Sequence, residues 1–445
     1  MISSQIASLT IPIVLQNLLS ALVSSTDAVM LNFVGQAQIS AVSLAGQYTS
    51  ILINIFFGLG TGVAMLGAQY YGKKDLKTVE NVEGIALRFA VPITFLFGLA
   101  ALAIPRQMMR AFTPGPELIE IGAQYLRILS AAYFCWGFIE IYLSTLRSIG
   151  RVAVCTVLNL ITFGLNIFLN AVFIFGLFGA PKLGAVGVAI ATAISRAVEL
   201  ILVIIVSANS RDVKLRPSLI FVRNHLLSQD FLRMALPALL NDVSWGTAFS
   251  MYSVIFGQFY GSDMVAANSF VNIVRGYGTV LSGGLAGACG ILIGQIIGAD
   301  RMKEAEETAG KFVKLTILSG VIGGLLILIT TPLVVHFADL TKAAKGYLRT
   351  MLLINSYYIM GVAVNTTLIS GVFRSGGDSR FGMIVDTIDM WGYAVPLGFF
   401  AAGVLKLPPM WTYFRICTDE FVKWPWVIGH YKSRKWLKNI TRDLK

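Results

Sequence analysis

The chain has 445 residues, of which 56% are hydrophobic and only 13% are charged. Its mean hydropathy is +0.73. Soluble domains carry about 25% charged residues, so this chain lacks the polar surface that a water-soluble particle of its length needs. The composition therefore excludes a soluble enzyme, a disordered protein and a disulfide-stapled scaffold. At ~20 apolar residues for each membrane crossing, plus short connections, the length fits about twelve transmembrane helices.

Lysine and arginine outnumber aspartate and glutamate by 35 to 23, which gives a formal net charge of +12. The basic residues gather in alternate connections between the apolar stretches and in the C-terminal tail, around residues 73–77, 147–151, 211–223, 301–311, 374–380 and 432–445. Cytoplasmic loops of membrane proteins carry such an excess. We therefore expect both termini in the cytoplasm and an even number of spans, and no nucleic-acid partner.

Apolar stretches bounded by glycine, proline and charged residues predict twelve helices. In chain order they cover about residues 4–33, 40–71, 84–105, 117–145, 152–176, 184–208, 229–258, 264–297, 307–336, 343–372, 379–404 and 409–431. The expected fold class is therefore all-α, a polytopic membrane protein of twelve transmembrane helices. The longest polar connection, residues 209–228, would be a cytoplasmic linker. It separates an N-lobe (residues 1–208) from a C-lobe (residues 229–445) that ends in a basic cytoplasmic tail.

The two halves of the chain resemble each other. Pro12, Gly35, the Gln69-Tyr-Tyr-Gly72 run and Arg147-Ser-Ile-Gly150 recur in the same order as Pro237, Gly261, Gln295-Ile-Ile-Gly298 and Arg374-Ser-Gly-Gly377, at offsets of 225 to 227 residues. Six helices return the chain to the side from which it started, so the two copies enter the membrane from the same side. We expect two parallel six-helix bundles, an arrangement typical of alternating-access transporters.

Acidic side chains inside the apolar stretches are the main functional candidates. An ionised group at the centre of a bilayer costs at least ~2.5–3.5 kcal/mol and is usually kept for an ion pathway, a partner or a switch. The acids that meet this description best are Asp27, Asp242, Asp386 and Asp389. Glu140 and Glu199 lie close in sequence to Arg147 and Arg196, and there we expect plain ion pairs.

Asp27 and three neutral polar residues of the N-lobe are predicted at similar depth. Asp27 lies about six residues before the outer end of the first helix, or ~9 Å at 1.5 Å per residue. Asn166 and Asn170 share one face of the fifth helix, and Thr192 lies about eight residues into the sixth. We predict that Asp27, Asn166, Asn170 and Thr192 form a cation-coupling site. It could hold Na⁺ with its oxygens, or Asp27 could carry a proton; the other interpretation is a hydrogen-bonded acid that only packs helices.

The C-lobe acids are expected nearer the cytoplasm. Asp386 and Asp389 share a face of the eleventh helix, and Asp242 lies on the seventh. They could line a cavity for cationic substrates or form a second coupling site. Alternatively, they pair with a basic residue such as Arg275 or Arg415.

Several motifs in both halves resemble the multidrug and toxic compound extrusion (MATE) family, within the multidrug/oligosaccharidyl-lipid/polysaccharide flippase superfamily. They are Pro12, Asp27-Ala-Val-Met30, Gly58/Gly60/Gly62, Gln69-Tyr-Tyr-Gly72-Lys-Lys-Asp75, residues 184–195 and Phe373-Arg-Ser-Gly-Gly-Asp-Ser-Arg380. The resemblance implies an antiporter, not an enzyme, that exports organic cations or amphiphilic drugs in exchange for inward H⁺ or Na⁺. It implies no cofactor, no metal beyond Na⁺ at Asp27, and a first-lobe cation site at positions matching Asp27 and its neighbours.

The chain departs from this pattern at three places. Arg151 stands where Asp is usual, Asn170 where many relatives carry Asp, and Asn241-Asp242 where similar sequences often have Glu. The amide at position 170 leaves the N-lobe site one formal charge poorer.

Two other functions remain open at this point. A lipid-linked saccharide flippase of the same superfamily would need basic residues in its cleft, for which Arg196, Arg275 and Arg415 are candidates. A passive channel or membrane receptor would need a pore-lining ring or a large ligand domain, and the sequence indicates neither. We expect a monomeric, multi-pass protein of the cell (plasma or inner) membrane, surrounded by lipid.

Overall fold

The computed structural model describes residues 2–222 and 224–443, without the side chains of residues 2, 3, 24, 25, 27–29, 31 and 32. Within this part nearly every residue is helical and no strand occurs. The all-α fold class is therefore confirmed. Among the described residues, nine helices are long and apolar enough to cross a membrane, so the count of twelve spans stays a prediction.

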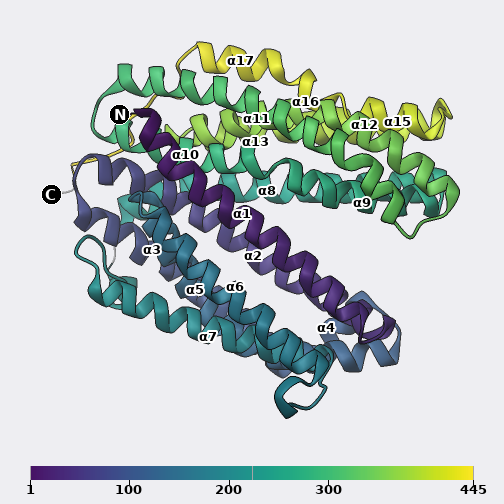
Figure 1. Cartoon of the computed structure of the whole chain (residues 1–445). Coiled ribbons are helices and arrows are strands. Elements are labelled where there is room, and N and C mark those ends of the chain that lie inside the picture. The colour runs from purple at the N-terminus through teal and green to yellow at the C-terminus, as the bar shows by residue number, and fades with distance from the viewer. Residues whose placement is uncertain (1, 223, 444–445) are drawn as a thin grey trace. The chain divides into compact units, whose positions relative to one another are not determined.

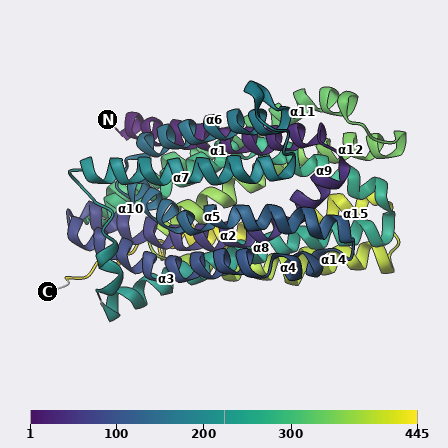
Figure 2. The ribbon, with the colours of Figure 1, turned by 90° about the horizontal axis from the view of Figure 1, so that it is seen from below.

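The chain forms two compact units, an N-unit of residues 18–235 and a C-unit of residues 1–17 and 236–445. The N-unit holds most of α1 (Ile2–Asn32), the start of α8 (His225–Tyr260), and between them α2 (Gln36–Gly72), α3 (Leu76–Ala103), α4 (Pro105–Phe112), α5 (Pro116–Ser148), α6 (Val152–Phe175), η1 (Leu177–Gly179), α7 (Ala185–Asn209) and η2 (Pro217–Phe221). Helix α5 packs against α2, α3 and α7, as Figures 1 and 2 show.

The C-unit holds the first turns of α1, the rest of α8, and a series of helices that is more often interrupted. These are α9 (Ser262–Gly278), α10 (Val280–Gly298), α11 (Met302–Phe337), α12 (Lys342–Asn365), η3 (Thr366–Phe373), α13 (Ser379–Thr387), η4 (Ile388–Ala394), α14 (Val395–Phe399), η5 (Phe400–Val404), α15 (Pro409–Ile416), α16 (Asp419–Val422) and α17 (Trp424–Lys432). The segments η3, η4 and η5 are π-helical. Helices α11 and α12 pack along each other, as Figure 1 shows.

The outer face of α11 is apolar. Leu325 and Leu333 are about half exposed, and Ile329 between them is 72% exposed. Their spacing of four residues places them on one side of the helix. A stripe of large apolar side chains on the outside of a helix is what a lipid-facing surface requires.

Backbone conformation supports the internal repeat. Gly35 and Gly261 both have a positive φ before a helix, and so do Gly150 and Gly377 in the turns that follow the paired Arg-Ser motifs. The non-glycine residues Lys74 and Asp300 also form such a pair, with φ of 66° and 61°. Residues other than glycine adopt this region rarely. A matching exception in both halves is what a duplicated turn predicts.

Three of the predicted helices differ most from the structure. Helix α3 begins at Leu76 instead of about residue 84, because the Asp75 side chain accepts a hydrogen bond from the Thr78 backbone N–H and caps the helix. The predicted helix over 264–297 is interrupted at Thr279. The predicted helix over 409–431 is three short helices.

Each unit contains the beginning of a helix that continues in the other unit. In the C-unit, Val14 of α1 packs on Gly284 of α10, where an added Cβ would lie 2.3 Å from its side chain. In the N-unit, Phe231 of α8 packs on Gly62 of α2, where an added Cβ would lie 2.9 Å from the ring. Glycine is required at both places because the helices approach closely.

The α11–α12 contact gives a test of the fold. We expect Gly324→Ala to lower the free energy of unfolding by ~1–3 kcal/mol through overpacking. The new Cβ would lie 2.3 Å from the backbone oxygen of Ser356, which cannot rotate away. The measurement is thermal unfolding of the purified, detergent-solubilised protein. The matched control is Gly310→Ala on the same helix, where the nearest atom would be 3.8 Å away; equal unfolding temperatures for the two variants would contradict the packing described here.

Candidate functional site

The predicted N-lobe site involves α1, α6 and α7. Asp27 lies in α1, but its side chain is outside the part of the chain that the structure describes. Nothing structural is therefore added to the prediction for Asp27. The other three predicted members, Asn166, Asn170 and Thr192, are described.

Asn166, Asn170 and Thr192 form a continuous chain of hydrogen bonds. The Asn170 amide donates to Asn166 Oδ1 at 3.2 Å, and the Asn166 amide donates to Thr192 Oγ1 at 3.3 Å. The spacing of four residues on α6 brings the two amides together, and α7 packs against α6 so that Thr192 reaches them. Both asparagines are buried and Thr192 is partly buried. The structure thus brings these three polar side chains together between two apolar helices.

The three predicted acids of the C-unit all have basic partners. Asp242 on α8 forms an ion pair with Arg374, which follows η3, at 3.0 Å. Asp386 on α13 accepts hydrogen bonds from the Asn241 amide at 3.0 Å and from Lys423 Nζ at 2.9 Å. Asp389 on η4 lies 3.7 Å from the same Lys423 nitrogen. The sequence predicts Asp386 and Asp389 on one face of the helix over residues 379–404. Both side chains lie near the same lysine, Lys423.

Lys423 is the residue that sequence reasoning missed. It lies between α16 and α17, is 2% exposed, and also forms an ion pair with Glu420 at 3.1 Å. A run of Asp419, Glu420 and Lys423 inside an otherwise apolar stretch was the available signal. The three charges stand close together in sequence, whereas the predicted candidates are isolated acids.

The basic residues named from sequence have other contacts. The Arg275 guanidinium lies 4.1 Å from the centre of the Phe249 ring and donates to Asn272. Arg415 is exposed. Neither is the partner of Asp386 or Asp389; that partner is Lys423.

The two plain ion pairs expected from sequence are confirmed. Arg147 lies 3.9 Å from Glu140, and Arg196 lies 2.6 Å from Glu199. The Arg196 guanidinium also stacks over the Trp136 ring at 4.1 Å. These contacts occupy Arg196 within its own unit.

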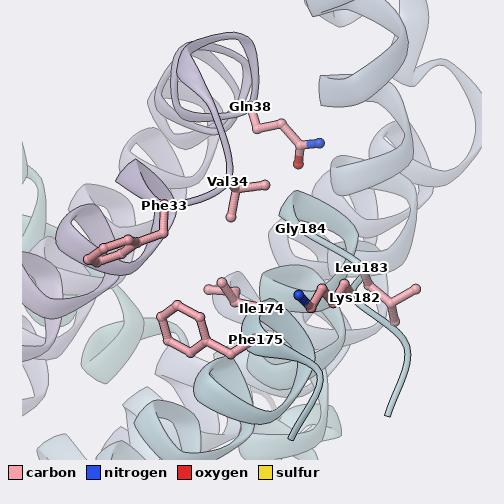
Figure 3. Close-up of a pocket in the computed structure, with 8 residues that line it drawn as sticks. All are labelled: Phe33, Val34, Gln38, Ile174, Phe175, Lys182, Leu183 and Gly184. Carbon is pink, nitrogen blue, oxygen red and sulfur yellow. The ribbon is translucent and has the colours of Figure 1, made fainter. Parts of the chain in front are cut away.

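A cavity of about 320 Å³ lies in the N-unit where α1 meets α2 and where α6 gives way to α7. Figure 3 shows the rings of Phe33 and Phe175 on one side and Gln38 and Lys182 on the other. The Gln38 side-chain oxygen accepts from the Ala185 N–H at 2.6 Å and so holds the start of α7. This is the helix that carries Thr192, two turns further along.

The described residues also bear on metal binding. In residues 2–222 and 224–443 no group of three or more His, Cys, Asp or Glu side chains is arranged to hold a metal ion.

The sequence matches a family of known proteins over most of its length. The MatE family model matches residues 12–172 and 243–400. The chain is 27% identical over 445 residues to a probable multidrug resistance protein YoeA of Bacillus subtilis (strain 168), covering 97% of this chain and 94% of that protein. It is 24% identical to a probable multidrug resistance protein NorM of Listeria monocytogenes, covering 92% and 90%.

The fold also matches solved structures. One of them, described as the outward-facing conformation of a multidrug resistance MATE family transporter of the MOP superfamily, superposes with a TM-score of 0.87 at 21% identity, covering 97% of this chain and 96% of that one. The two matched segments of the family model together span well over half of the chain. The chain belongs to the MatE family, the MATE multidrug efflux transporters, and is a membrane transporter and not an enzyme.

Proposed function

We propose that this transporter is a secondary active antiporter that exports organic cations or amphiphilic drugs in exchange for inward H⁺ or Na⁺. The mechanism is alternating access between two six-helix lobes, residues 1–208 and 229–445, joined by a cytoplasmic linker of residues 209–228. Relatives described as multidrug resistance proteins support the substrate class. The protein acts as a monomer, without a cofactor, in the cell membrane with both termini in the cytoplasm.

The coupling ion is proposed to bind at Asp27, Asn166, Asn170 and Thr192. The observation that carries this proposal is the buried hydrogen-bond chain from Asn170 through Asn166 to Thr192. Three neutral polar groups in an apolar interior are costly unless they are satisfied. Their amide and hydroxyl oxygens, added to one carboxylate, suit a hard monovalent cation or hold a protonated acid in place. One monovalent charge moving inward gains ~2.3 kcal/mol per 100 mV.

Asp242, Asp386 and Asp389 are proposed as a secondary acidic region for cationic substrates. Arg374 and Lys423 occupy these acids in the present structure. A substrate cation would therefore compete with an internal cation for the same carboxylates. Substrate binding would then be weaker in a conformation in which these ion pairs are intact than in one in which they are broken.

The flippase of the same superfamily is the alternative. It requires arginines free to neutralise a diphosphate. Arg196 is taken up by Glu199 and Trp136, and Arg275 by Phe249 and Asn272. Arg415, the third candidate, is exposed. The contacts of Arg196 and Arg275 favour the antiporter.

Removing the charge of Asp27 tests the coupling site. In proteoliposomes with an imposed Na⁺ or pH gradient, applied one at a time, we expect Asp27→Asn to abolish gradient-driven drug exchange, because the amide can neither release a proton nor supply a charged ligand. The control is Asp339→Asn, which makes the same acid-to-amide change at an exposed site between α11 and α12. Exchange that continues unchanged in Asp27→Asn would refute the assignment.

Removing the central amide tests the polar chain independently. Asn166→Ala deletes both hydrogen bonds, at ~0.5–1.5 kcal/mol each. We expect the concentration of coupling ion that gives half-maximal exchange to rise about 5- to 150-fold, which corresponds to the loss of both hydrogen bonds. Asn159→Ala, two turns earlier on α6, is the matched control. If both variants need the same ion concentration, Asn166 does not contribute to the site.

A further inference from the structure

A short segment follows the last helix of each half of the chain and packs back on the unit to which it belongs. We call residues 210–222, after α7, the N-strap, and residues 433–443, after α17, the C-strap. A fully buried apolar side chain anchors each of them, Val213 in the N-strap and Trp436 in the C-strap. The straps are therefore parts of the packed units and not loose connections.

Both straps use an arginine to contact an equivalent glutamate. In the N-unit, the Arg216 guanidinium of the N-strap lies 3.3 Å from the Glu80 carboxylate on α3. In the C-unit, the Arg434 guanidinium of the C-strap lies 2.6 Å from the Glu306 carboxylate on α11. Glu80 and Glu306 are 226 residues apart, which is an offset of the internal repeat. The first contact of the straps is thus the same in the two units.

Equivalent glycines lie one turn further along these two helices. A Cβ on Gly84 of α3 would lie 2.5 Å from the Cβ of Leu219 in the N-strap. The nearest atom to a Cβ on Gly310 of α11 would be the hydroxyl oxygen of Tyr431, at 3.8 Å, just before the C-strap begins. Each strap therefore meets the equivalent helix at the equivalent place, and the N-strap does so more closely.

A further contact has the same position in both units but the opposite charges. Arg151, in the turn before α6, lies 2.5 Å from Asp212 of the N-strap. Asp378, in the turn before α13, lies 4.0 Å from Lys438 of the C-strap and 2.9 Å from His430. Arg151 corresponds to Asp378 and Asp212 to Lys438, at offsets of 227 and 226 residues. The unusual arginine at position 151 is thus matched by an acid on the strap that it contacts.

We propose that this reversed ion pair makes the two straps non-interchangeable, so that each docks only on its own unit. The glutamate–arginine contacts have the same signs in both units and would accept either strap. The reversed pair would not. The N-strap on the C-unit would bring Asp212 to Asp378, and the C-strap on the N-unit would bring Lys438 to Arg151. Specificity depends on such repulsive contacts as well as on attractive ones.

A duplicated chain has a particular need for this discrimination. Its two halves present similar docking surfaces, and during folding each strap can meet either of them. An exposed ion pair adds little to stability, so we assign the pair to the choice of surface and not to the strength of docking. The proposal depends neither on the coupling ion nor on the substrate of the proposed antiport.

Hydrogen–deuterium exchange of the full-length, detergent-solubilised protein, measured by mass spectrometry, tests the proposal. Asp212→Lys gives the N-strap the charge that the C-strap carries at the equivalent position. We expect the backbone amides of residues 210–222 to exchange about 2- to 30-fold faster, because an exposed attractive pair becomes a repulsive one. Exchange in residues 433–443 should not change. Adding Arg151→Asp reverses the partner as well and should restore the exchange of the unmodified protein.

The matched control is Arg211→Asp, which reverses the charge of the exposed neighbouring residue and should leave the exchange of residues 210–222 unchanged. Unchanged exchange in Asp212→Lys, or no recovery in the double variant, overturns the proposal. If Asp212→Lys does not purify, Asp212→Asn removes the attraction without adding repulsion. A smaller increase confined to residues 210–222 then supports the proposal, and no increase overturns it.

The reciprocal variant tests the C-strap. Lys438→Asp gives this strap the charge of Asp212, and we expect faster exchange in residues 433–443 alone. Faster exchange in both straps would show a general loss of structure, and unchanged exchange would show that the charge is not read; either result overturns the proposal.

Discussion

A charge that is taken out of water must be balanced within its own surroundings, and this constraint governs the functional parts of this chain. Only 13% of the residues are charged, and many of those within the helices have a partner one or two turns away or on a neighbouring helix. Arg196 and Glu199 balance each other within one helix, three residues apart. Arg374 and Asp242 balance each other although they belong to elements far apart in sequence. Lys423 lies near three acids at once, at 2.9 Å from Asp386, 3.1 Å from Glu420 and 3.7 Å from Asp389. The two candidate sites therefore differ in their polar groups: amides and a hydroxyl at Asn166, Asn170 and Thr192, and ion pairs at Asp242, Asp386 and Asp389.

Much of the fold was predictable because it depends on local signals. The lengths of the apolar stretches and the positions of glycine and proline predict the helices. The repeated Arg-Ser turns predict the duplication, and Gly150 and Gly377 in these turns both have a positive φ. The boundaries that were wrong depend on single side chains. Asp75 extends α3 into a polar region by capping it. The last helical stretch is interrupted at Cys417 and Thr418 and again at Lys423. Hydropathy averages over such details.

The candidate site was predictable in part for the same reason. Asn166 and Asn170 are neighbours by helical spacing, so their contact follows from sequence. The Asn166–Thr192 contact needs only adjacent helices. Lys423 meets Asp386 across 37 residues and several helix breaks, and no periodicity carries that information. Residues paired over long distances must be found from the packing.

The exchanged helix starts have a consequence for how the protein is made. Val14 is synthesised well before its packing partner, Gly284 of α10, which follows more than half a chain later. Until then the first turns of α1 lack this packing partner. Either half of the chain, expressed alone, would lack the helix start that packs into its own unit. It would instead carry the helix start that packs into the other unit. Two such halves could complete each other by domain swapping, and joining them in one chain makes that exchange intramolecular.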